Sequence, residues 1–148
     1  MGVRDDVVPT LERSPLFAGH SRKQIEKALV DFDEQTFMAG NRIVSEGRTG
    51  PDFFIILEGE AEVVDAHDDR VVARLGAGDF FGEIAALDEG PRTRSVRATT
   101  QLRALGLPNG TFRQFLVEHP TFTINMMQAI VRRFRAVVTS ADQKVAGS

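Results

Sequence analysis

The sequence contains no cysteine, and this absence excludes several kinds of chemistry. Disulfides, thiolate metal sites, iron–sulfur clusters and a cysteine nucleophile all need the thiol. The sequence also lacks an apolar run near the roughly 18 residues that a membrane span needs. Its start, MGVRDD, lacks the basic and apolar segments of a secretory signal, and Asp6 stands where the myristoylation pattern needs Ser or Thr. We therefore expect a cytoplasmic protein that makes no membrane contact.

Positive charge is not in excess either. The formal net charge of −3 argues against a nucleic-acid-binding surface on this chain. The sequence shows no Ser-His-Asp set, no metal-ligand spacing and no Walker loop. Its histidines, His20, His67 and His119, are far apart in turn-like segments, and we interpret them as solvated loop residues. We expect a protein that is not an enzyme, holds no metal or cofactor and does not itself bind nucleic acid.

The length of 148 residues, with 42% apolar and 26% charged residues, predicts one globular domain over residues 1–148. Residues 1–31 form its N-terminal part, with short helices over 5–13 and 21–30 and Ser21 as an N-cap. Short apolar runs punctuated by turn glycines fill 32–108, which is typical of a compact all-β roll or barrel. Residues 109–148 are helical, with a short helix capped by Asn109 and ended by Pro120, then a long one.

The long C-terminal helix carries two apolar stripes. One stripe suits burial against the β-roll: Phe122, Met126, Ile130 and Val137. The second steps in a 3-4-3-4-3 pattern, whose heptad spacing predicts a seam between two copies of the chain: Ile124, Met127, Val131, Phe134, Val138 and Ala141. The basic stretch RRFR at 132–135 is interpreted as a solvated helix face that flanks Phe134.

Two short motifs point to a pocket for a phosphate ester. In GDFFGEIAAL, Gly82 allows the backbone to approach a ligand, and Glu83 opens a helical turn where it can accept a hydrogen bond from a sugar hydroxyl. In PRT, the Arg92 guanidinium can fork onto two phosphate oxygens, and Thr93 adds a third donor. Together they describe a nucleotide with a free ribose hydroxyl. Each motif alone also fits a common turn or a surface ion pair of Arg92.

The stretch FGEIAALDEGPRTRSVRA closely resembles the phosphate-binding cassette of cyclic-nucleotide-binding domains, the family of catabolite activator protein and of protein kinase A regulatory subunits. The resemblance implies a mainly β fold with flanking helices: an eight-stranded jelly-roll-like β-roll with an FFIILEGEAEV hairpin, short N-terminal helices and a long C-terminal helix that dimerises. It places Gly82 and Glu83 at the ribose and Arg92 and Thr93 at the cyclic phosphate. Ile84 and Ala85 belong to the same ligand-binding stretch.

This sequence differs from the family pattern at two places. Arg94 stands where the family has alanine, and in a regular strand it points to the same side as Arg92. We expect it to add positive potential at the phosphate, and the alternative is a plug paired with Glu83 or Asp88. The resemblance also implies that the long helix contacts the base. The matching positions are Val137 and Val138, and the hydroxyl residues Thr139 and Ser140 follow them. We expect cAMP as the ligand, and cGMP stays open as an alternative.

The resulting hypothesis is a sensor domain that binds a cyclic nucleotide and converts binding into a rearrangement of the C-terminal helix. Two alternatives remain at the level of the sequence. The chain could be a β-roll that serves as a dimerisation or docking module without a ligand. It could also be a fragment of a transcription regulator whose DNA-binding domain is absent, because too few residues follow Ser140 to form that module.

Overall fold

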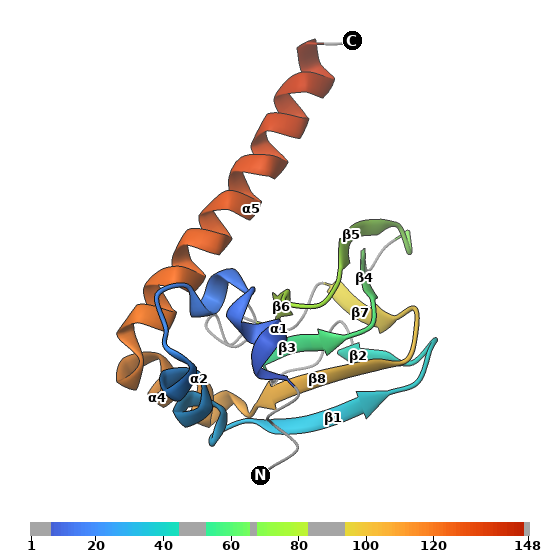
Figure 1. The fold of residues 1–148 in the computed structure, drawn as a ribbon. Helices are drawn as coiled ribbons and strands as arrows, with labels where there is room; N and C mark the ends of the chain where they lie inside the picture. Colours follow the sequence, from blue (N-terminus) through green and yellow to red (C-terminus); the bar gives the residue numbers. More distant parts are fainter. Residues whose placement is uncertain (1–6, 45–52, 66–67, 83–93, 147–148) are drawn as a thin grey trace.

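The computed structural model describes residues 7–44, 53–65, 68–82 and 94–146, and the side chains of the last helix up to Ala136. The chain forms three layers: helices, a first β-sheet and a second β-sheet (Figure 1). The helical layer combines both ends of the chain, and its elements are α1 (Val8–Glu12), the 3-10 helix η2 (Pro15–Phe17), α2 (Arg22–Leu29), α4 (Asn109–Glu118) and α5 (Pro120–Ala146).

Within the described ranges, eight strands form two four-stranded antiparallel sheets. In spatial order, the first sheet contains β1 (Asp33–Phe37), β8 (Leu102–Leu107), β3 (Phe53–Glu58) and β6 (Phe80–Phe81). The second contains β2 (Arg42–Val44), β7 (Arg94–Ala98), β4 (Ala61–Asp65) and β5 (Val71–Leu75). This arrangement confirms the predicted mainly β fold, a jelly-roll-like roll with short N-terminal helices and a long C-terminal helix.

The strand β3 is apolar from Phe53 to Leu57 because both of its faces are buried there, and only its last residue, Glu58, is exposed. Phe53, Ile55 and Leu57 pack into the core beneath the helices. Phe54 and Ile56, which alternate with them, pack into the core between the two sheets. Successive side chains of a strand point to opposite faces, so one run of apolar residues serves both cores.

The predicted FFIILEGEAEV hairpin is wrong, although both of its strands exist. β3 pairs with β8 and β6, while β4 pairs with β5 and β7 in the other sheet. The connection at Gly59, whose φ is +98°, carries the chain from one sheet to the other. It is held against the β7–β8 connection, where the Glu60 amide donates to Thr100 Oγ1 at 3.0 Å and the Thr99 amide donates to the Glu60 carbonyl at 2.9 Å.

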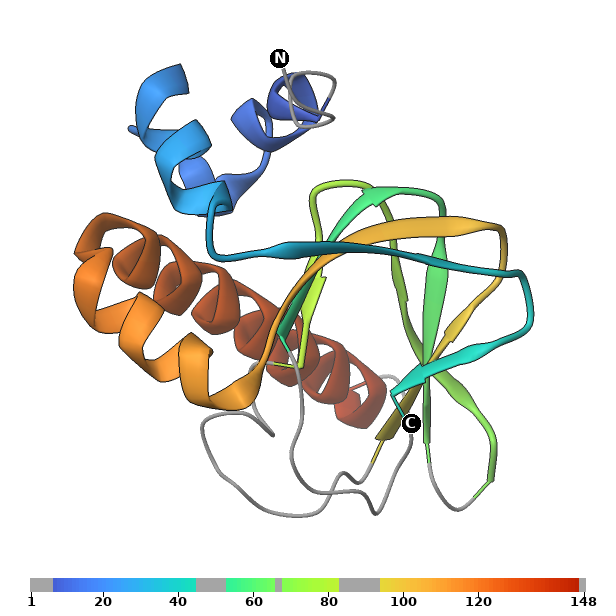
Figure 2. The ribbon, with the colours of Figure 1, turned by 90° about the horizontal axis from the view of Figure 1, so that it is seen from below.

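Aromatic rings join the helical layer to the first sheet. Phe53 of β3 stacks on Phe112 of α4 with ring centroids 4.5 Å apart. Phe122 of α5 makes edge contacts with Phe17, Phe53 and Phe115. In Figure 2, α4 and α5 lie side by side, and the two helices contact each other. The predicted core stripe of α5 is confirmed where side chains are described, because Phe122 and Met126 are buried and Ile130 is partly buried.

The helix ends follow the predictions in part. Ser21 caps α2 in a capping box with Gln24, as expected. Asn109 is not a cap, because the extended residue Pro108 precedes α4 and Asn109 is already its first helical residue. α4 ends at Glu118, and His119 leaves the helical region because the residue before a proline disfavours it. Among the described residues, no helix has the length and apolarity that crossing a membrane requires.

We predict that Gly59→Ala destabilises the protein more than Gly40→Ala does. Both glycines have a positive φ, which costs an L-residue roughly 1–2 kcal/mol. A Cβ at Gly59 would also meet the Gln101 carbonyl oxygen and lie 2.9 Å from the Leu102 Cα, whereas a Cβ at Gly40 meets nothing within 4 Å. We expect an extra loss of about 1–3 kcal/mol for Gly59→Ala, measured by urea denaturation. Equal losses in the two variants would contradict the close packing of this turn.

Candidate functional site

The structure describes the two ends of the predicted phosphate-binding stretch. Gly82 follows β6 directly, is half-buried and has a φ of +95°, a conformation that favours glycine. Arg94 is the first residue of β7. The predicted residues between them, Glu83, Ile84, Ala85, Arg92 and Thr93, lie outside the described residues.

Both flanking strands are held in the core. β6 pairs with β3 through Phe54–Phe81 and Ile55–Phe80, and both phenylalanines of β6 are buried. β7 lies between β2 and β4, with Ser95 and Val96 buried. Residues 83–93 therefore connect the edge strand β6 of the first sheet to the central strand β7 of the second.

The arginines of β7 face carboxylates of β4 across the strand pair. Arg97 Nη2 lies 3.1 Å from Glu62 Oε1, and the two residues are register partners. Arg94 is the register partner of Asp65, but its Nε is 3.9 Å from Asp65 Oδ2 and its side chain is 52% exposed. An exposed pair at this distance contributes little stability. The contact with Asp65 is thus a weak constraint on the Arg94 side chain.

Arg133 of α5 contacts the strand that leads into this segment. Its Nη2 donates a hydrogen bond of 2.7 Å to the carbonyl oxygen of Phe80, and its guanidinium carbon lies 3.9 Å from the centroid of the Phe80 ring. The interpretation of RRFR as a solvated face is therefore wrong for Arg133, which is half-buried, and right for Arg132 and Arg135, which are exposed. Sequence alone gave no signal for this contact, because the acceptor is a backbone carbonyl brought close by the fold.

The second apolar stripe of α5 faces away from the core. Phe134 is 67% exposed and Met127 58%, and Ile124 and Val131 are also exposed. The backbone of Val137, Val138, Thr139 and Ser140 continues α5, and their side chains lie outside the described residues. The stripe is therefore available for contact with another surface as far as the structure describes it.

Two of the three histidines are not simple solvated loop residues. The His119 ring is half-buried and stacks on Phe115 with centroids 4.1 Å apart. The His20 ring makes an edge contact with Phe17. His67 lies outside the described residues. Neither His119 nor His20 lies in the segment that flanks the predicted phosphate site, so both belong to a different part of the molecule.

Comparison with known proteins covers the part of the chain that contains the predicted phosphate-binding stretch. A family model described as a cyclic nucleotide-binding domain matches residues 34–119. A CRP-like cAMP-activated global transcriptional regulator of Mycobacterium tuberculosis is 26% identical over 84% of this chain and 57% of its own length. A cAMP-dependent protein kinase regulatory subunit of Pyricularia oryzae is 34% identical over 90% of this chain and 33% of its own length.

A solved structure agrees with the observed fold. The crystal structure of Thermus thermophilus catabolite activator protein matches with a TM-score of 0.79 and 28% identity, covering 87% of this chain and 62% of that one. The chain thus spans between about one third and three fifths of the lengths of these three proteins. The two relatives from Mycobacterium tuberculosis and Pyricularia oryzae are a transcriptional regulator and a kinase regulatory subunit.

We predict that Arg133→Met lowers the free energy of unfolding by about 1–3 kcal/mol, because it removes a hydrogen bond from a charged donor and a cation–π contact. Methionine keeps an apolar stem of similar length. Arg132→Met, one residue away on the exposed face, is the matched control and should change stability by less than about 0.5 kcal/mol. Both values come from urea denaturation. Indistinguishable stabilities of the two variants would contradict an energetically significant Arg133–Phe80 contact.

Proposed function

Because the chain belongs to the family of cyclic nucleotide-binding domains, we propose that it is a cytoplasmic sensor domain that binds a cyclic nucleotide, cAMP before cGMP. The observation that carries this proposal is the cassette sequence FGEIAALDEGPRTRSVRA, which lies inside the matched range. The names of the bacterial and fungal relatives both contain cAMP, and this supports cAMP as the first ligand to test.

We assign the ligand contacts by the chemistry of the cassette. Glu83 accepts a hydrogen bond from the ribose hydroxyl, and Gly82 leaves room for the sugar beside the backbone. Arg92 donates two hydrogen bonds to the cyclic phosphate, and Thr93 donates a further one. Ile84 and Ala85 belong to the same proposed ligand-binding stretch. The described geometry supports this assignment at its two ends, where Gly82 has a positive φ and Arg94 begins a central strand.

Arg94 adds a second positive charge near the phosphate in this proposal. Its side chain is half exposed, and its ion pair with Asp65 is long. An arginine held by so weak a pair can reorient toward an anion at small cost. The competing plug hypothesis requires a stronger partner, Glu83 or Asp88, and neither lies within the described residues.

The contact between Arg133 and Phe80 supplies a route from the ligand to α5. Phe80 precedes Gly82 by two residues, and its carbonyl accepts the Arg133 hydrogen bond. A movement of the cassette toward a ligand displaces β6 and therefore the group that Arg133 binds. A ligand shifts such an equilibrium only by its difference in affinity for the two helix arrangements. We propose that the arrangement of α5 is the output of the domain.

We also propose that two chains dimerise through α5. Ile124, Met127, Val131 and Phe134 follow heptad spacing and are all exposed in the single chain. An apolar stripe at this spacing packs well against an identical stripe on a second helix. Val138 continues the stripe in the sequence and lies where side chains are not described.

Arg92→Ala tests the proposed ligand site. Removing two charge-assisted hydrogen bonds, each worth roughly 1.5–3 kcal/mol, should weaken cAMP binding at least about a hundredfold in isothermal titration calorimetry, at about tenfold per 1.4 kcal/mol lost. Arg74→Ala is the control for the loss of one positive charge, because Arg74 is 78% exposed and pairs with Glu62 on the second sheet. Unchanged affinity in Arg92→Ala, or an equal loss in Arg74→Ala, would overturn the phosphate assignment.

Two companion variants refine the same titration. Glu83→Gln should weaken the binding of cAMP more than that of its 2′-deoxy analogue, because the analogue lacks the hydroxyl donor. Arg94→Ala should weaken binding if Arg94 adds positive potential. Tighter binding in Arg94→Ala would show instead that Arg94 plugs the pocket.

Phe134→Glu tests the proposed dimer. A carboxylate buried at an apolar interface has no partner, so the variant should be monomeric by light scattering at concentrations where the wild type is dimeric. Val117→Glu places the same charge on α4 at an apolar residue that is 76% exposed and outside the stripe, and it should stay dimeric. A monomeric wild type at high micromolar concentration would disprove the seam.

A further inference from the structure

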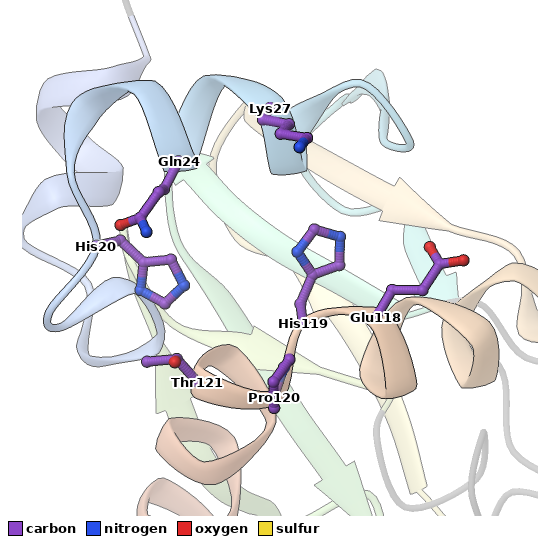
Figure 3. A pocket seen from close by; sticks show the side chains of 7 residues that line it. All are labelled: His20, Gln24, Lys27, Glu118, His119, Pro120 and Thr121. Carbon is purple, nitrogen blue, oxygen red and sulfur yellow. The ribbon is translucent and has the colours of Figure 1, made fainter.

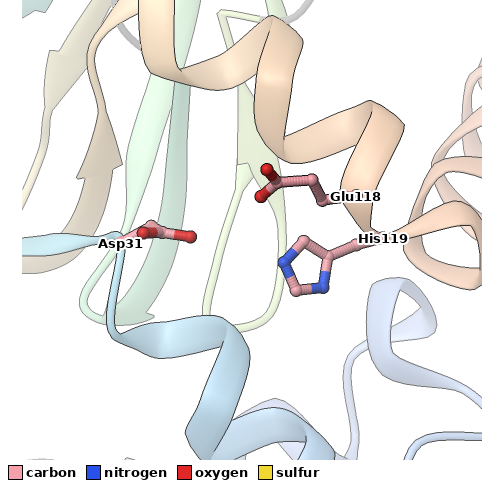
Figure 4. Close-up of side chains that lie close together, drawn as sticks. All are labelled: Asp31, Glu118 and His119. Carbon is pink, nitrogen blue, oxygen red and sulfur yellow. The ribbon is translucent and has the colours of Figure 1, made fainter.

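Three side chains with metal-binding groups converge at the junction of the N-terminal and C-terminal helices. Asp31 lies in the turn between α2 and β1, Glu118 is the last residue of α4, and His119 connects α4 to α5. Figure 4 shows the Asp31 and Glu118 carboxyl groups directed toward the space beside the His119 ring. One ligand atom from each residue lies within 4.8 Å of the other two.

Two of these side chains are oriented by neighbours. Gln114 Nε2 donates a hydrogen bond of 2.8 Å to Glu118 Oε1, one turn earlier on α4. The His119 ring stacks on Phe115 at an interplanar angle of 26°. Both contacts leave atoms that can bind a cation. A carboxylate oxygen of Glu118 accepts more than one bond, and stacking on Phe115 does not engage the ring nitrogens of His119. Partners that orient metal ligands in this way raise the affinity of a site.

The cluster borders a groove of about 410 Å³ between α2 and the α4–α5 junction (Figure 3). Glu118 and Lys27 are the charged residues of its lining, and Asp31 of the cluster adds a second carboxylate beside His119. Two carboxylates at one imidazole favour a cation. His20 lines the opposite side, where its Nδ1 lies 3.3 Å from the Ala18 carbonyl oxygen, and it is not part of the three-residue cluster.

We propose that Asp31, Glu118 and His119 bind a divalent transition-metal ion, Zn²⁺ in the first place, with water completing the coordination. One imidazole and two carboxylates suit Zn²⁺, whereas Ca²⁺ and Mg²⁺ prefer oxygen ligands alone. Bonds of about 2.0–2.2 Å in a tetrahedral site separate ligand atoms by about 3.3–3.6 Å. Asp31 and Glu118 are exposed, so rotation of their side chains can close the remaining distance.

The bound ion would tie the turn before β1 to the junction of α4 and α5. These segments are far apart in the sequence, so ligand spacing did not reveal the cluster. An ion that binds the folded chain and not the unfolded one raises the melting temperature. The site is separate from the proposed nucleotide pocket, and its test needs no nucleotide.

The experiment is a calorimetric titration of Zn²⁺ into tag-free, metal-free protein in a buffer without chelators, with melting temperatures recorded in parallel. We expect one Zn²⁺ per chain, a higher melting temperature with Zn²⁺, and much weaker binding of Mg²⁺. Asp31→Asn and His119→Gln should each weaken Zn²⁺ binding at least about tenfold. Loss of a residue that only orients a metal ligand already weakens metal binding by about that factor, and loss of the ligand itself should cost at least as much. His20→Gln, across the same groove, should bind Zn²⁺ like the wild type.

Each contrary outcome is decisive. Absence of saturable Zn²⁺ binding at millimolar concentration overturns the site. Unchanged affinity in both Asp31→Asn and His119→Gln, or an equal loss in His20→Gln, overturns the three-residue assignment. Metal-free melting temperatures of the variants within about 2 °C of the wild type ensure that a loss of affinity reflects the ligands and not the fold.

Discussion

Burial of β3 on both faces is the constraint on which the rest of the structure depends. One face of this strand requires a helical cover and the other requires a second sheet, so the chain must place a layer on each side. The helical cover comes from both ends of the chain, where Phe17, Phe112 and Phe122 meet the ring of Phe53 or one another. The second sheet follows because the Gly59 turn carries the chain across at the end of β3.

This arrangement puts the helical layer next to the strand that leads into the cassette. β6 pairs with β3 in the same sheet, so Phe80 contributes to the core beneath the helices. Arg133 of α5 therefore reaches both the ring and the carbonyl of Phe80. In the proposed sensor, α5 contacts Phe80 directly, and Phe80 lies in the strand that leads into residues 83–93.

The sequence predicted those features that local pattern or motif controls. The apolar run FFIILE, the turn glycines and the capping box at Ser21 each indicated their element, and the cassette motif indicated the family. Features that depend on tertiary approach were missed. The hairpin prediction failed because β3 and β4 belong to different sheets, and the Gly59 turn between them packs closely against residues 100–102. The exposure of Arg133 was misjudged because its acceptor is a backbone carbonyl 53 residues away.

Hydrogen–deuterium exchange of the wild-type protein, with and without saturating cAMP, tests the central claim most directly. We expect the nucleotide to change the exchange rates of β6 and of α5 around Arg133 as well as those of residues 83–93. Unchanged exchange throughout the chain would contradict binding itself. A change confined to residues 83–93 would contradict the coupling of the ligand site to α5.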